Sequence, residues 1–139
     1  MANTELTTRI ELSLLTLAIS WFLSGLALSV RLWDARAGSL FFVWSVPFFV
    51  AGWVLLGIPA IAMGTQILKL SPVVLGMSGA IAGLFIMLLP TGWLIALGAV
   101  QFKLTWSLVT GWDGFGAAIG AGGMLLYRWL LSRAVPSES

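Results

Sequence analysis

Long apolar stretches alternate with short polar segments along the whole chain. This pattern predicts four helical membrane spans, at about residues 12–30, 40–63, 72–100 and 114–132. A helix needs about 20 predominantly apolar residues to cross a hydrocarbon core of about 30 Å, and each stretch is close to or above that length. We therefore expect an all-α, polytopic integral membrane helical bundle that forms a single domain over residues 1–139.

The segment at residues 92–110 leaves a second topology open. If the chain turns tightly between Pro90 and Gly92, this segment also crosses and the bundle has five spans. It contains Gln101 and Lys103, and a lysine at the centre of a span costs about 2.5–3.5 kcal/mol on insertion scales. The five-span topology separates the basic loop residues more cleanly between the two sides of the membrane. The insertion cost of Lys103 outweighs this advantage, so we predict four spans, with Pro90 as a kink in the third. If the segment is buried, Gln101 and Lys103 are the candidates for a polar pathway.

Hydroxyl side chains recur at three- and four-residue spacing along the first predicted span. They are Ser13, Thr16, Ser20 and Ser24. This spacing places them on one side of a helix. Such a face either packs against a neighbouring helix or lines a hydrophilic path. We favour packing, because hydroxyls in a span commonly bond to a carbonyl of their own helix or to an adjacent helix.

Small residues mark two further helix faces. The third span contains Gly79-x-x-x-Gly83, and the fourth contains Gly116-x-x-x-Gly120. Glycines at this spacing let two helix backbones approach closely, so we predict helix packing at all four. The sequence leaves open whether each face meets the same chain or another one. A phosphate loop is excluded, because no Gly-Lys-Ser/Thr follows these glycines.

The second predicted span contains two prolines, Pro47 and Pro59. Each removes an amide donor and tends to bend a helix. Neighbouring helices can satisfy the freed carbonyls in a membrane, so we expect structural kinks rather than a functional opening.

Composition narrows the chemistry mainly by exclusion. The chain is 60% hydrophobic and 9% charged, with a mean hydropathy of +1.05, and it has no histidine and no cysteine. These absences rule out histidine-ligated haem or metal, disulfides and thiol catalysis. Since the spans also lack a paired acidic cluster, we predict that the protein is not an enzyme and has no cofactor or metal site. A bound lipid, quinone or carotenoid stays open, because none of these needs a ligating residue.

Charged and aromatic residues gather at the ends of the predicted spans. Those expected at the interface or against lipid headgroups are Arg31, Trp33, Arg36, Arg128, Trp129 and Arg133. Flanking arginine and tryptophan are ordinary interfacial anchors. The positive-inside rule weakly favours a cytoplasmic C-terminus, and we expect a bacterial inner membrane. Seven basic residues against five acidic ones are too few and too scattered for nucleic-acid binding.

Two functional hypotheses follow. The first is a non-catalytic structural or accessory subunit, whose partners are the lipid bilayer and either other membrane subunits or copies of itself. The alternative is a small homo-oligomeric channel, permease or pore-forming protein. Its path would be lined by Lys103 or by the hydroxyl stripe of the first span.

Overall fold

The computed structural model is built of helices and describes residues 2–32, 35–98, 111 and 114–135. In chain order the elements are α1 (Ala2–Leu32), α2 (Ala35–Trp44), α3 (Val46–Gly52), the π-helix η1 (Trp53–Gly57), α4 (Ile58–Met63), the 3₁₀-helix η2 (Gly64–Lys69), α5 (Pro72–Ala96) and α7 (Gly114–Ala134). The all-α prediction is confirmed for this part of the chain.

Three stretches are long and apolar enough to cross a membrane: Thr4–Val30, Val46–Lys69 and Pro72–Leu89. They support an integral membrane protein in contact with a lipid bilayer. The fourth predicted span corresponds to α7, which has 21 residues but is not among them. Its glycines and Arg128 lower its hydropathy.

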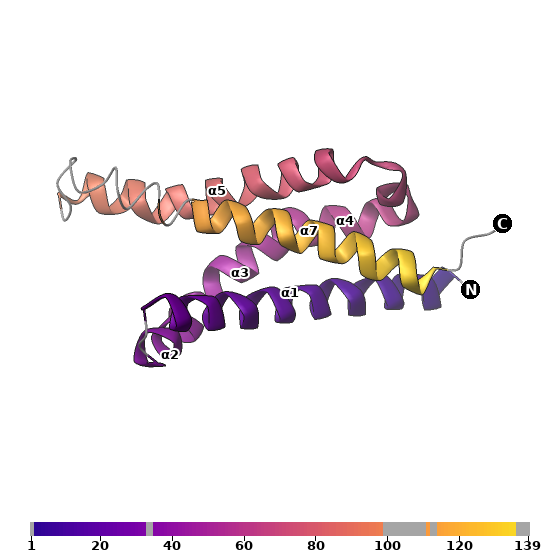
Figure 1. Cartoon of the computed structure of the whole chain (residues 1–139). Coiled ribbons are helices and arrows are strands. Elements are labelled where there is room, and N and C mark those ends of the chain that lie inside the picture. Colours follow the sequence, from indigo (N-terminus) through magenta and orange to yellow (C-terminus); the bar gives the residue numbers. More distant parts are fainter. Residues whose placement is uncertain (1, 33–34, 99–110, 112–113, 136–139) are drawn as a thin grey trace.

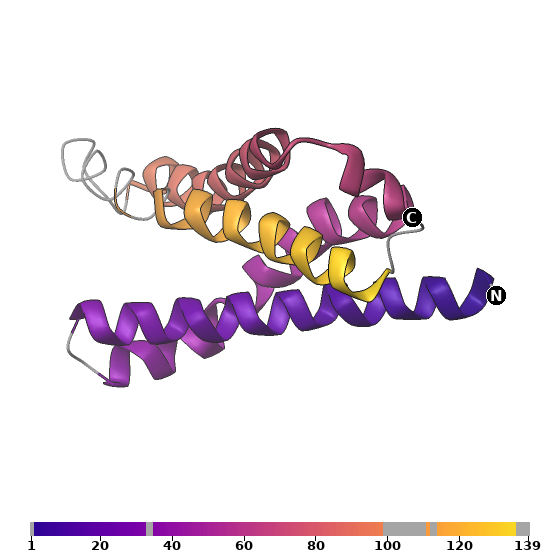
Figure 2. The ribbon, with the colours of Figure 1, turned by 45° about the vertical axis from the view of Figure 1, so that its right-hand side comes forward.

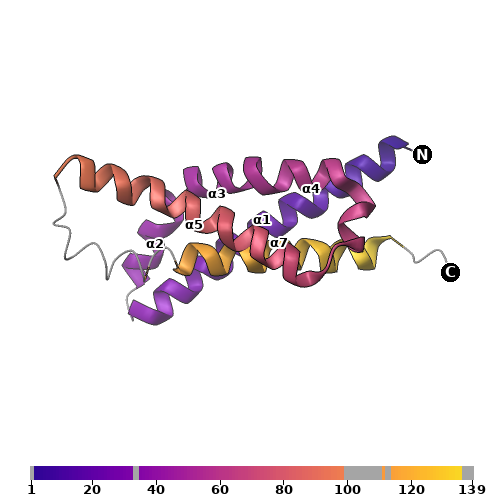
Figure 3. The same cartoon turned by 90° about the horizontal axis from the view of Figure 1, so that it is seen from above.

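Four lengths of helix run alongside one another and alternate in direction (Figures 1 and 3). They are α1, the stretch from α3 to α4, α5 and α7. The start of α1, the η2 turn and the end of α7 lie at the same end of the molecule. Helix α7 lies between α5 and α1 and contacts both (Figure 2). We call the end that holds η2 the termini end.

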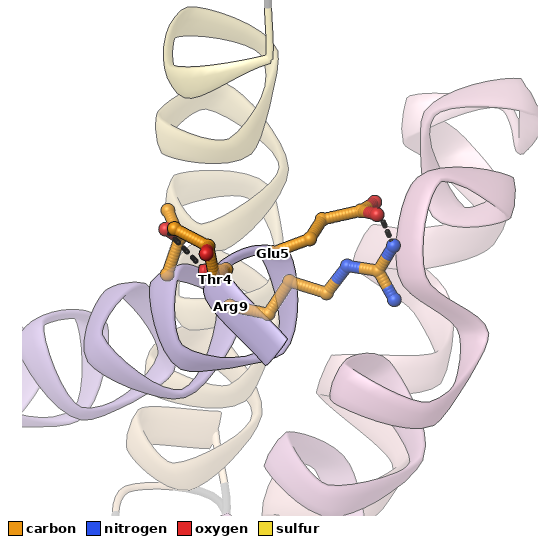
Figure 4. A network of polar contacts seen from close by, with 4 residues as sticks. Thr4, Glu5 and Arg9 are labelled. Carbon is orange, nitrogen blue, oxygen red and sulfur yellow. Dashed lines mark hydrogen bonds and ion pairs between the residues drawn. The ribbon is translucent and has the colours of Figure 1, made fainter. Parts of the chain in front are cut away.

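Helix α1 begins well before residue 12, where we predicted the span to start. Local interactions extend the helix into the polar N-terminal segment. The hydroxyl of Thr8 donates to the carbonyl oxygen of Thr4 over 3.0 Å, and Arg9 forms an ion pair with Glu5 one turn away (Figure 4). Pairs at this spacing support an exposed helix end, so the helix continues beyond the apolar stretch.

Both predicted proline bends coincide with irregular helix. Ser45 separates α2 from α3 two residues before Pro47, and its carbonyl oxygen accepts from the amides of both Phe48 and Phe49 at 3.0 Å. The π-helix η1 comes just before Pro59. A proline ring clashes with the carbonyl four residues earlier, and a wider π turn relieves that clash.

Helix α5 runs through Pro90 without interruption and ends at Ala96. The residues from Pro90 to Gly92 therefore do not form the tight turn of the five-span alternative. The helix stops at a turn that includes Gly98, whose φ of +68° is a conformation suited to glycine at a helix end. The rest of the 92–110 segment lies outside the described residues, so its burial stays a prediction.

Few large side chains are buried. The core lies toward the termini end and consists of Ala60, Ile67, Leu75, Met124, Tyr127 and Leu131. Many other large apolar side chains point outward, such as Val73, Ile81 and Phe85 of α5, which are 61–68% exposed. An apolar exterior suits a helical bundle surrounded by lipid tails.

Candidate functional site

Helices α5 and α7 meet backbone to backbone at four glycines. A Cβ atom on Gly79 would overlap the carbonyl oxygen of Gly120, and a Cβ atom on Gly120 would overlap that of Gly79. Gly83 and Gly116 form a second reciprocal pair, in which a Cβ atom on Gly116 would lie 2.8 Å from the carbonyl oxygen of Gly83. The pairing follows an antiparallel register, and both glycine faces have their partner within the same chain.

The predicted hydroxyl stripe of α1 faces into the bundle. Ser13, Thr16 and Ser24 are buried, and Ser20 is half-buried. Three of these hydroxyls donate to carbonyls of their own helix: Ser13 to Ile10 at 2.8 Å, Thr16 to Leu12 at 2.8 Å and Ser24 to Ser20 at 2.5 Å. These bonds satisfy the donors locally, which is the usual behaviour of serine and threonine in membrane helices.

Two tryptophans link α1 to the second helical stretch. The indole nitrogen of Trp53 donates to the Ser13 hydroxyl at 3.1 Å, and that of Trp21 donates to the Ser45 hydroxyl at 2.9 Å. Trp21 also meets the ring of Phe42 edge-on at 5.2 Å. We did not predict these two hydrogen bonds, because no local sequence pattern marks them. Trp53 and Ser13 are 40 residues apart in the sequence, and Trp21 and Ser45 are 24 residues apart.

A cavity of about 110 Å³ lies where α1, α3, η1, α4, α5 and α7 meet. Its lining is mostly apolar and aromatic and includes Phe49, Trp53, Met87 and Met124. The polar side chains at its wall include Ser20 and Tyr127. The sequence places Tyr127, the only tyrosine of the chain, among interfacial residues beside Arg128 and Trp129 and does not predict its burial.

Basic side chains gather at the termini end. The guanidinium of Arg9 covers Gly64 at the start of η2, where a Cβ atom would lie 2.6 Å from the Cζ of Arg9. Arg128 donates to the carbonyl oxygen of Leu68 at 3.1 Å and so ties α7 to η2. The guanidinium of Arg133 lies over the ring of Trp129, 5.2 Å from its centroid.

The remaining predicted interface residues fall at the opposite end or outside the described part. Arg31 is in the last turn of α1, and Arg36 is exposed in the first turn of α2. The interface residue Trp33 and the candidates for a polar pathway, Gln101 and Lys103, lie outside the described residues. Their roles therefore stay predictions.

No family model, curated protein or solved structure matches this chain. Its class is therefore defined by its own structure, which is that of a helical protein with three candidate membrane-spanning helices. Within residues 2–32, 35–98, 111 and 114–135, no group of three or more acidic, histidine or cysteine side chains is placed to hold a metal ion.

Proposed function

We propose that the chain is a four-span, non-catalytic integral membrane protein that serves as a structural or accessory subunit of a larger membrane complex. The observation that carries this proposal is the reciprocal contact of Gly79 with Gly120 and of Gly83 with Gly116. These glycines hold the bundle together from within. Contacts with partners are then left to its outer apolar faces.

The glycine contact also supports α7 as the fourth span. Helix α7 packs along α5, whose residues 72–89 are a candidate span, so the two helices lie at a similar depth. Arg128 is close to the end of α7, where a long basic side chain can reach the interface.

The termini end carries most of the basic residues in the described ranges. It holds Arg9, Lys69, Arg128 and Arg133, against Arg31 and Arg36 at the other end. The positive-inside rule therefore favours cytoplasmic termini. We propose the bacterial inner membrane as the location of the protein.

The outer face of α5 is the best candidate for a subunit contact. Large exposed side chains recur there every four residues, at Val73, Met77, Ile81, Phe85 and Leu89. Residues at this spacing form one continuous row along a helix. A partner helix can pack along this row without disturbing the glycine contact with α7.

Site-specific photo-crosslinking in native membranes tests the proposal. A benzoylphenylalanine in place of Phe85 probes the α5 row, and the same residue in place of Leu23 probes the exposed face of α1. We expect a discrete adduct with another membrane polypeptide at Phe85 and none of the same mass at Leu23. Adducts with lipid alone at Phe85, together with a monomer in mild detergent, would contradict the subunit role.

The channel hypothesis has less support. The Ser13 and Thr16 hydroxyls already donate to carbonyls of α1, and the cavity beside them is mostly apolar. Ion or solute flux through reconstituted vesicles tests this alternative. Flux that disappears in a Lys103→Ala variant would favour the channel over the accessory subunit.

A further inference from the structure

The hydroxyl group of Tyr127 is buried without a hydrogen-bond partner. The residue is 3% exposed, its hydroxyl oxygen has no partner among the described residues, and it lines the cavity between the helices. A buried hydroxyl left unpaired destabilises the fold, because it has lost its bonds to water and gained none in exchange. An oxygen atom of a bound molecule in the cavity would remove this destabilisation.

The cavity is elongated along part of α7. On α7 its wall consists of Gly116, Ile119, Gly120, Gly123, Met124 and Tyr127. These positions share one helix face, and at 1.5 Å per residue they cover about 16 Å. An apolar cavity of about 150 Å³ is known to hold a benzene ring, so a volume of about 110 Å³ has room for part of a slender hydrocarbon.

The position of Tyr127 fits the level of lipid ester groups. Arg128 and Trp129 follow it directly, and both are residue types that mark the membrane interface. From Tyr127 the cavity wall leads along α7 toward Gly116, away from the termini end. Its length of about 16 Å matches one leaflet of a hydrocarbon core of about 30 Å.

We propose that this cavity is a binding site for one acyl chain of a bilayer phospholipid, whose ester carbonyl oxygen accepts a hydrogen bond from the Tyr127 hydroxyl. The acyl chain lies against Ile119, Gly123 and Met124 of α7 and the apolar and aromatic side chains of α1, α3 and η1. The proposal is independent of the subunit role, because it concerns only the interior of the bundle.

Two neighbouring glycines of α7 provide a matched pair of variants. A Cβ atom on Gly123 would lie 3.5 Å from the Ser20 hydroxyl at the cavity wall, so Gly123→Leu fills the cavity. A Cβ atom on Gly122 would meet nothing within 4 Å, so Gly122→Leu makes the same chemical change outside it. Tyr127→Phe removes only the hydroxyl.

The probe is a phosphatidylcholine with a diazirine on one acyl chain, present at about one-tenth of the lipid in phosphatidylcholine vesicles that hold the full-length protein. After illumination, mass spectrometry locates the lipid adducts. We expect adducts at the cavity-lining residues Leu17 and Ile119, besides those at outward residues such as Ile81. The outward adducts report folding and insertion in the same sample.

In Gly123→Leu we expect the cavity adducts to fall at least fivefold while the Ile81 adducts stay, and in Gly122→Leu we expect neither to change. Tyr127→Phe should lower the cavity adducts about two- to threefold. Absence of cavity adducts in the unaltered protein, or equal cavity adducts in Gly123→Leu, would overturn the site. An unchanged yield in Tyr127→Phe would overturn the hydrogen bond to the ester.

Extraction of the protein purified from native membranes distinguishes the other possible occupants. A stoichiometric phospholipid in the organic extract, reduced in Gly123→Leu but not in Gly122→Leu, supports the acyl-chain site. If the stoichiometric compound that Gly123→Leu reduces is instead a quinone or a carotenoid, identified by its absorption spectrum, the assignment to phospholipid is overturned.

Discussion

The indole nitrogen of Trp53 donates a hydrogen bond to the hydroxyl oxygen of Ser13 over 3.1 Å, joining η1 to α1 across 40 residues of sequence. The Ser13 hydroxyl in turn donates to the carbonyl of Ile10. The Ser13 hydroxyl therefore donates one hydrogen bond within α1 and accepts another from η1. This chain of two bonds holds the irregular second stretch against the first helix.

Trp53→Phe should weaken the bundle by removing the only bond that reaches Ser13 from η1 within the described residues. Interhelical hydrogen bonds in membranes contribute on average about 0.6 kcal/mol and up to about 1.7 kcal/mol. A double-mutant cycle with Ser13→Ala, measured by reversible unfolding in mixed micelles, should give a coupling energy in that range.

Trp44→Phe serves as the control for the tryptophan change. Trp44 is 74% exposed on α2, so the substitution should leave the free energy of unfolding nearly unchanged. A coupling energy near zero between Trp53 and Ser13 would mean that the hydrogen bond does not stabilise the fold.

Gly79→Ala should force α5 and α7 apart, because its Cβ atom would overlap the backbone carbonyl of Gly120. Overpacking of a tight contact costs about 1–3 kcal/mol. We expect a loss of stability of that size in micelles. Gly122→Ala is the matched control on α7, since its Cβ atom meets nothing within 4 Å. Equal stabilities of the two variants would contradict the close backbone contact.

The helical membrane character and the faces of the helices could be predicted from sequence, because both depend on local composition and spacing. The two glycine faces are visible as three-residue gaps between small residues, and the hydroxyl stripe as a run of three- and four-residue steps. Their partners are set by tertiary packing. For that reason the sequence left open whether Gly79 and Gly83 meet the same chain.

The cavity and its buried tyrosine could not be predicted in the same way. The cavity exists because small residues such as Gly123 leave space between helices that meet only in the folded chain. Tyr127 stands next to Arg128 and Trp129 and therefore has the sequence context of an interfacial residue. It is buried in one core cluster with Ile67 and Leu75, which come from distant segments.

Gly64→Ala should destabilise the protein more than Gly98→Ala. Both glycines have a positive φ, of +56° and +68° respectively, which strains any residue with a Cβ atom. Only Gly64 is also covered by a side chain, the guanidinium of Arg9. Such backbone strain costs about 1–3 kcal/mol. Thermal unfolding in detergent should rank the variants in this order.

An Arg9→Ala background tests the cause of the difference. If the Arg9 side chain crowds the new methyl group, Gly64→Ala should cost less in that background, while the cost of Gly98→Ala should not change. A cost of Gly64→Ala that is independent of Arg9 would assign the whole effect to the backbone.

Single cysteines can establish the topology, because the chain has no cysteine of its own. Arg36 in α2 and Gln66 in η2 are both exposed. They lie on either side of the helical stretch from α3 to α4. With cytoplasmic termini, a membrane-impermeant maleimide added to spheroplasts should label Arg36→Cys directly. It should label Gln66→Cys only after permeabilisation. Labelling of both from the same side would mean that this stretch does not cross.

A third cysteine, at Lys103, addresses the segment between α5 and α7. Four spans place this position outside the hydrocarbon core on the same side as Arg36, so Lys103→Cys should react in intact spheroplasts about as fast as Arg36→Cys. Five spans would bury it in the bilayer, where thiols are poorly ionised and react slowly with maleimides. A slow reaction that persists after permeabilisation would therefore favour five spans, and would restore Lys103 as a candidate for a polar pathway.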